Sequence, residues 1–160
     1  MNETFETALA AVLGWEGGYV NDPRDAGGET NFGISARAYP GLNIKSLTRD
    51  QAAALYRRDY WDACRCDALP SPLALLVFDA AVNQGPGAAV RMMQEAAGVP
   101  EDGRIGPRTL AAAQAPAVVG AFAVARARRY AGARDFPAFG RGWLNRLFDM
   151  HRRAVLMGEG

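Results

Sequence analysis

The feature that most constrains the fold is a glycine-rich, irregular segment within a chain that is otherwise patterned for helices. Long irregular segments inside helical domains are usually functional or disordered. Within this one, Tyr19-Val20 and Asn31–Ser35 predict a short hairpin. The chain is therefore expected to be mainly α, with one small turn-rich region. That region spans residues 17–46 and contains Gly17, Gly18, Gly27, Gly28, Gly33, Gly41, Pro23 and Pro40.

Apolar spacing and capping signals predict helices over the rest of the chain. Residues 3–16 place Phe5, Leu9 and Val12 on one helical face. Thr48 and Gln51 form a capping-box pattern that begins a helix expected to run to about Tyr60. The remaining expected helices begin at Pro72 with Ser71 as N-cap, at Pro86 and at Pro107, cover residues 116–132, and include Trp143–Val155 at the end of the chain.

Length and charge exclude several classes of protein. The 160 residues suffice for one domain with a sizeable core. Apolar residues make up 49% and charged residues 22% of the chain, which is typical of a soluble globular protein and argues against disorder. A net charge of +1 is too small for a protein that binds nucleic acid by neutralising phosphates. No apolar run approaches the roughly 18 residues of a membrane helix, so we expect no stable membrane insertion.

Cysteine and histidine are too scarce for most metal or thiol chemistry. Cys64 and Cys66 lie too close in sequence for a disulfide framework, and with His151 they do not make a zinc site. Nothing around either cysteine suggests a Cys–His nucleophile. We expect no metal and no cofactor. The acidic N-terminus, with no basic residue before Arg24, is unlike a secretory signal, so synthesis in the cytoplasm is expected.

Glu16 is the first candidate catalytic residue. On a helical wheel of about 100° per residue it lies within about 20° of Phe5, in the middle of the apolar face. It also occupies the last turn of the helix, just before Gly17-Gly18. Partial burial and the negative end of the helix dipole both favour the protonated carboxyl. A carboxyl that keeps its proton near neutral pH can serve as a general acid; the alternative is a glutamate that bends out to solvent.

The irregular segment supplies a second carboxylate. Asp25 follows Glu16 by nine positions, and Thr30 follows Asp25 by five. Glycosidases place two carboxyl groups across the scissile bond, one protonated and one ionised. Asp25 on a polar loop would stay ionised, and Thr30 could orient a water molecule, while Asp22 is a further candidate for the second carboxylate. Alternatively, both aspartates only form turns.

The run from Glu16 to Ser35 resembles the signature of glycoside hydrolase family 108, which comprises lysozyme-like N-acetylmuramidases, often phage or prophage endolysins. The Glu–Asp–Thr order is also similar to that of T4-type phage lysozymes, with a shorter Asp-to-Thr interval. The likeness continues through most of the chain. It includes Tyr60-Trp61, the helix Phe78–Gly85, the stretch from Gln94 to Thr109, and Gly142–Arg146.

Several of these residues suit a glycan, because sugars are bound by aromatic faces and by amides. Tyr60 and Trp61 could supply the faces, and Asn83 and Gln84 the amides; Asn31, like Asp22, is a further candidate for substrate binding. Each has a structural alternative: Trp61 as core and Asn83 as a helix cap. Asp79, on an apolar helix, is expected to be a buried partner of an arginine.

The resemblance implies a mainly α, lysozyme-like, two-lobed domain over residues 1–160. Its glycine-rich catalytic lobe would span about 1–66, and its helical, peptidoglycan-associated half about 67–160. The implied reaction is hydrolysis of the β-1,4 bond between N-acetylmuramic acid and N-acetylglucosamine. Glu16 would protonate the leaving glycosidic oxygen. Asp25 would stabilise the oxocarbenium-like transition state or help to activate water, and Thr30 would position that water.

The implied partner is the glycan strand of peptidoglycan, and the protein would be a monomer. Without an export signal, it would need a holin or a similar route to reach the wall from the cytoplasm. Two alternatives stay open. One is a lytic transglycosylase, which uses one acid and no water. The other is a non-catalytic peptidoglycan-binding or secretion-accessory protein.

Overall fold

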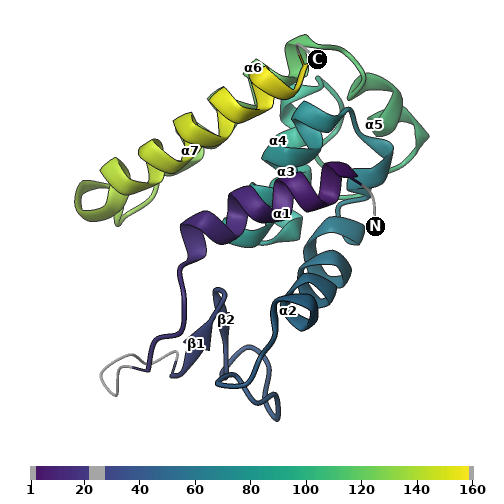
Figure 1. Ribbon diagram of the computed structural model, residues 1–160. Coiled ribbons are helices and arrows are strands. Elements are labelled where there is room, and N and C mark those ends of the chain that lie inside the picture. Colours follow the sequence, from purple (N-terminus) through teal and green to yellow (C-terminus); the bar gives the residue numbers. More distant parts are fainter. Residues whose placement is uncertain (1–2, 22–27, 159–160) are drawn as a thin grey trace.

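The computed structural model describes residues 3–21 and 28–158, and these residues fold into a helical body above a small lobe that holds a hairpin (Figure 1). Helix α1 (Glu3–Glu16) buries Phe5, Leu9 and Val12, so its predicted apolar face is confirmed. Its last residue is Glu16, after which the chain runs down into the small lobe (Figure 1).

The small lobe holds a two-residue antiparallel pair, β1 (Thr30–Asn31) and β2 (Ile34–Ser35). A bridge from Val20 to Thr30 extends it, so the predicted hairpin is confirmed. Phe32 and Gly33 connect the strands, and both have positive φ, +52° and +75°. Tight hairpin turns favour this backbone because its twist matches that of the strands.

Helix α2 (Arg49–Tyr56) begins at the predicted capping box. The backbone N–H of Gln51 donates to the Thr48 hydroxyl, and the Gln51 side chain accepts from the Thr48 backbone N–H. The helix was expected to run to about Tyr60, but from Arg57 to Asp62 it widens into a π-helix, η1. A short 3₁₀ turn, η2 (Cys66–Ala68), follows.

Helix α3 (Ser71–Gln84) is the centre of the core. Every residue from Leu73 to Ala81 is buried, and the helix packs against α1, α4, α6 and α7. A helix that is apolar on all sides is stable only when it is surrounded. Its cap differs from the prediction, because the N-cap is Pro70 and Ser71 is already helical.

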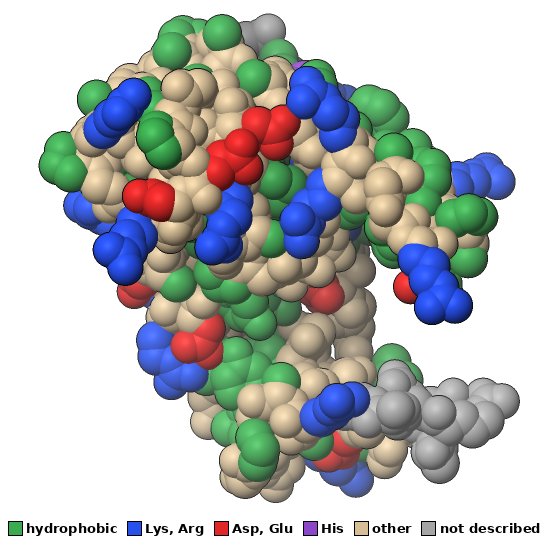
Figure 2. All heavy atoms as spheres, turned by 180° about the vertical axis from the view of Figure 1, so that it is seen from behind, with side chains coloured by type: hydrophobic (Ala, Val, Ile, Leu, Met, Phe, Trp, Pro, Cys, Tyr) green, Lys and Arg blue, Asp and Glu red, His purple; other side chains and the backbone are tan. Residues whose placement is uncertain are grey.

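The remaining helices also belong to the helical body, and α4, α6 and α7 pack against α3 (Figure 1). They are α4 (Pro86–Ala96), α5 (Pro107–Ala112), α6 (Ala117–Ala131) and α7 (Phe136–Gly158). None of the helices in the described part of the chain is long and apolar enough to cross a bilayer. Seen from behind, the surface is hollowed between the helical body and the small lobe (Figure 2).

Candidate active site

Glu16 lies where the helical body meets the small lobe. Its side chain is about one-fifth exposed, at 20%, so it is neither in the core nor free in solvent. The helix-wheel prediction of a half-buried carboxyl is therefore confirmed. The groups that surround it come from three other parts of the chain.

The turn between β1 and β2 packs directly against Glu16. A Cβ placed on Gly33 would lie 2.8 Å from Glu16 Cβ, from Glu16 Oε2 and from Tyr56 Oη. Gly33 therefore has to be glycine for two reasons, its positive φ and the lack of space. The Tyr56 hydroxyl donates a 2.7 Å hydrogen bond to the carbonyl of Phe32, which ties α2 to the same turn.

Arg146, on α7, is the charged neighbour of Glu16. Its Nη1 lies 2.7 Å from Glu16 Oε1, and its Nε donates to Asp79 Oδ1 at 2.8 Å. The guanidinium thus joins the carboxyl at the end of α1 to a fully buried carboxylate on α3.

The ion pairs continue into the body as a network of Glu16, Arg146, Asp79 and Arg126. Arg126 Nη1, fully buried on α6, donates to Asp79 Oδ2 at 2.6 Å. Both oxygens of Asp79 are therefore bound by guanidinium groups, which confirms its expected pairing with an arginine. Burial alone would lower the pKa of Arg146, but the charges of Asp79 and Glu16 outweigh it and raise that pKa.

Tyr56 is also perturbed by this environment. Burial raises the pKa of its hydroxyl well above the ordinary value, and the nearby charge of Glu16 raises it further. Tyr56 therefore stays protonated over the working range of an enzyme. A neutral hydroxyl can donate to the turn at every such pH, so it serves as a fixed support and not as a base.

The predicted catalytic residues other than Glu16 lie in the small lobe. Thr30 is a half-buried residue of β1, and its backbone pairs with Val20 on one side. It belongs to the hairpin whose turn contacts Glu16, so the structure brings these two elements together. Asp22 and Asp25 lie outside the described residues.

Two predicted substrate-binding residues are instead structural. Asn31 is buried, and its Nδ2 donates to the carbonyls of Ile44 at 3.2 Å and of Leu47 at 3.5 Å. Trp61 has no exposed surface. Its Nε1 donates to Asp67, and its ring packs edge-on against aromatic rings of the core. Because these side chains are buried and already bonded or packed within the protein, they have no free surface that could bind a sugar. The prediction that Asn31 and Trp61 bind substrate is therefore corrected: both stabilise the fold.

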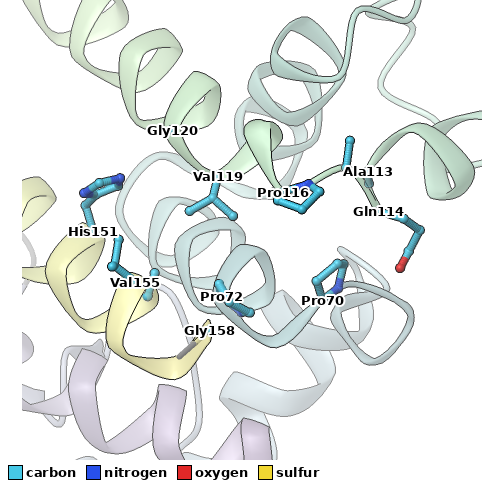
Figure 3. Close-up of a pocket in the computed structure, with 12 residues that line it drawn as sticks. Pro70, Pro72, Ala113, Gln114, Pro116, Val119, Gly120, His151, Val155 and Gly158 are labelled. Atoms are coloured by element: carbon cyan, nitrogen blue, oxygen red, sulfur yellow. The ribbon is translucent and has the colours of Figure 1, made fainter. Parts of the chain in front are cut away.

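The other three candidates retain accessible surface. Tyr60 is half-buried in the small lobe, with its ring 5.6 Å from that of Tyr56. Asn83 and Gln84, at the end of α3, line a cavity of about 500 Å³. This cavity is separate from the apolar pocket of Figure 3, which has a volume of about 510 Å³. Among the residues that line the pocket of Figure 3, the titratable side chain is that of His151. This pocket therefore lacks the carboxyl groups that glycoside cleavage needs.

Sequence reasoning missed Arg146 and Tyr56 as neighbours of Glu16. Arg146 was noticed only as part of the stretch Gly142–Arg146, and 130 positions separate it from Glu16. Local spacing carries no information about such a contact. Within residues 3–21 and 28–158 no group of three or more His, Cys, Asp or Glu side chains could hold a metal ion.

Comparison with known proteins assigns the chain to a family. The sequence model of glycosyl hydrolase 108 matches residues 9–85, and that of a domain described as a predicted peptidoglycan domain matches residues 88–148. The solved structure of Brucella abortus SagA is 35% identical, with a TM-score of 0.86, over 98% of this chain and 97% of that one. The comparison with curated proteins found no match.

These matches confirm the mainly α, lysozyme-like fold expected from the sequence. They also fix the general activity: the chain is a glycoside hydrolase whose substrate is peptidoglycan. The boundary between the two matched regions, near residue 86, falls at the junction of α3 and α4. The chain belongs to glycosyl hydrolase family 108.

Proposed function

We propose that the chain hydrolyses the β-1,4 bond between N-acetylmuramic acid and N-acetylglucosamine, with Glu16 as the general acid. The observation that carries the proposal is the placement of Glu16. It lies at the junction of the helical body and the small lobe, a fifth exposed, with one carboxyl oxygen bound by Arg146 and the other against the β1–β2 turn. Arg146 and the turn thus hold the carboxyl in place, and a substrate can still reach it.

In the proposed mechanism, the proton resides on Glu16 Oε2, because Oε1 faces the guanidinium of Arg146. A bound glycan displaces water from around the carboxyl. Glu16 then protonates the glycosidic oxygen, which leaves with N-acetylglucosamine as its bond to the anomeric carbon of N-acetylmuramic acid breaks, and positive charge develops on that anomeric carbon. Arg146 stabilises the carboxylate that remains after the proton has left.

A second carboxylate would stabilise the developing oxocarbenium ion. We assign this role to Asp25 or Asp22. Thr30 positions the attacking water, whose oxygen bonds to the anomeric carbon as its proton passes to that second carboxylate. The position of Thr30 on β1 supports its part, since the same hairpin forms the turn that packs on Glu16. Arg146 and Tyr56 act through Glu16 and through the turn, so they are positioning residues.

The test is Glu16→Gln, which removes the transferable proton and keeps the shape of the side chain. Loss of a general acid typically lowers the rate by about 10²–10⁴-fold. The activity is measured on purified sacculi, and the products are identified by mass spectrometry. Glu95→Gln is the matched control, because Glu95 pairs with the exposed Arg128 on the body and should leave the rate unchanged.

The products separate the competing functions. Reducing muramic acid ends support the muramidase, whereas anhydro-muramyl ends would identify a lytic transglycosylase. Reducing N-acetylglucosamine ends would place the cleavage at the other glycosidic bond. A Glu16→Gln variant within threefold of wild type would leave the proposed mechanism without its acid. Such a result would assign the proton transfer to another group, whereas a wild type that releases no cleavage products would favour peptidoglycan binding without catalysis.

A further inference from the structure

The helical body has a further cavity that the proposed mechanism does not use. The cavity of about 500 Å³ at the end of α3 lies between this helix and the segments around the α6–α7 connection. We call it the amide–arginine pocket. Its lining residues are Asn83, Gln84, Arg129, Tyr130, Gly132, Ala133 and Trp143.

The polar groups of this pocket are mainly donors. Asn83 Oδ1 accepts hydrogen bonds from Tyr130 Oη at 2.8 Å and from Arg126 Nη2 at 3.4 Å, so its Nδ2 is left to donate to a ligand. Arg129 is exposed, and no carboxylate among the described residues pairs with it. No aspartate or glutamate lines the pocket. This combination favours an anionic ligand, and a planar guanidinium is well matched to a carboxylate.

Gln84 adds a second amide to the pocket. Its Oε1 is buried and receives no hydrogen bond from any residue in the described part of the chain. Buried acceptors are seldom left unpaired. A ligand that brings an N–H donor together with a carboxylate would satisfy both Gln84 and Arg129, and this combination is typical of a peptide.

The apolar wall of the pocket suits a peptide as well. The rings of Tyr130 and Trp143, which both line the pocket, lie 5.2 Å apart. Phe139 is not among the lining residues, but it stacks on Trp143 at 6.1 Å and is largely exposed. Aromatic surface of this kind binds the aliphatic parts of small side chains.

The pocket is close to the candidate active site. On α3, Asn83 lies one helical turn beyond Asp79, and on α7, Trp143 lies nearly one turn before Arg146. Asp79 and Arg146 contact each other, and Arg146 contacts Glu16. One helical turn is about 5.4 Å, so only a short distance separates the pocket from the ion pairs of Glu16. An extended peptide spans that distance with about two residues.

We propose that the amide–arginine pocket binds the carboxylate-bearing stem peptide of peptidoglycan. This inference rests on the proposed function. Stem peptides branch from the lactyl group of the muramic acid that flanks the bond to be cleaved, so a strand seated at Glu16 carries a peptide within reach of the pocket. The pocket thus makes the hydrolase selective for glycan that bears peptides.

The first test compares two substrates. One is a soluble peptidoglycan strand with its stem peptides, and the other is the same strand after an amidase has removed them. Arg129→Ala should raise KM for the peptide-bearing strand about five- to twentyfold and leave kcat within about twofold. On the stripped strand it should match wild type. Arg128→Ala is the control, because it removes the same charge from the adjacent position, where the side chain pairs with Glu95 outside the pocket.

The second test measures binding without catalysis. Calorimetry measures the binding of two ligands to wild type, Arg129→Ala and Arg128→Ala. One ligand is a muramyl tripeptide, and the other is the same compound with its carboxylates amidated. The free-carboxylate compound should bind wild type and Arg128→Ala, and should bind Arg129→Ala about five- to twentyfold more weakly. The amidated compound should bind all three proteins equally weakly.

The outcomes distinguish this inference from the proposed function. If Arg129→Ala binds the muramyl tripeptide as wild type does and has an unchanged KM, the pocket does not hold the peptide, and the muramidase proposal stands. If Glu16→Gln hydrolyses sacculi like wild type but Arg129→Ala still loses tripeptide binding, the proposed mechanism is wrong, and the assignment of the pocket to the stem peptide is supported. Equal binding of the amidated and free-carboxylate compounds to wild type would also overturn the inference.

Discussion

Gly33 shows how much of the candidate site depends on a single missing side chain. Its φ of +75° and its contact with Glu16 and Tyr56 are two separate demands, and each excludes other residues. Gly41 has the same kind of backbone, with φ +88°, but a Cβ there would meet nothing within 4 Å. The two glycines therefore allow backbone strain to be separated from displacement of the Glu16 carboxyl.

We predict that Gly33→Ala and Gly41→Ala each destabilise the fold by about 1–2 kcal/mol, because alanine is strained at positive φ. Only Gly33→Ala should also impair catalysis, by at least about tenfold, since its Cβ pushes against Glu16. Denaturant unfolding gives the stability, and hydrolysis of sacculi gives the activity. Equal loss of activity in the two variants would show that the contact with Glu16 is unimportant.

At the scale of elements, sequence patterns located the helices because each depends on local chemistry. The capping box at Thr48 and the apolar face of α1 are both fixed by residues within a few positions of one another. The change from α2 to a π-helix at Arg57 was not predictable in this way. It accommodates Trp61, whose fully buried ring packs against Phe5 and Phe78 from distant helices.

The connection between α4 and α5 provides a prediction about pH. Asp102 accepts hydrogen bonds from the Arg104 backbone N–H and from Gln94 Nε2, both at 2.8 Å, and these lower the pKa of its carboxyl. Because the folded pKa lies below the unfolded value of about 3.9, the ionised carboxylate stabilises the fold above that value. This stabilisation is lost as the pH falls through the folded pKa.

The stability difference between wild type and Asp102→Ala should accordingly be full at neutral pH and shrink below about pH 4. Urea unfolding of both proteins from pH 7 down to pH 3 measures it. Glu101→Ala is the control, since this exposed neighbour has no comparable hydrogen bond to any residue that the structure describes, and its substitution should have little effect at neutral pH. A difference between wild type and Asp102→Ala that grows as the pH falls would contradict the prediction.

At the scale of the whole molecule, the candidate site is assembled from α1, α2, α3, α7 and the hairpin. The sequence identified Glu16 because its helix position and the following glycines are local signals. It could not identify Arg146 as its partner, because that contact depends on how α7 packs across the molecule. The same limit explains Trp61, since a ring suited to binding sugar is equally suited to a core, and only the packing decides between the two.

The network of Glu16, Arg146, Asp79 and Arg126 links the stability of the whole body to the site. Asp79 is the one carboxylate of the network that is fully buried, and it binds guanidinium groups from both α6 and α7. Asp79→Asn keeps the shape of the side chain but leaves those two cations with too little negative charge. Breaking a buried pair in this way costs about 3–5 kcal/mol, whereas loss of an exposed pair costs about 1 kcal/mol or less.

Asp79→Asn should therefore lower the free energy of unfolding by several times more than Glu95→Gln, which breaks the exposed pair with Arg128. Guanidinium chloride is unsuitable because it screens ion pairs, so urea unfolding at neutral pH is the measurement. Activity should fall as well, since Arg146 loses the anchor that aims it at Glu16. If Asp79→Asn proved as stable as Glu95→Gln, the network would not hold the three helices together, and Arg146 would need another anchor.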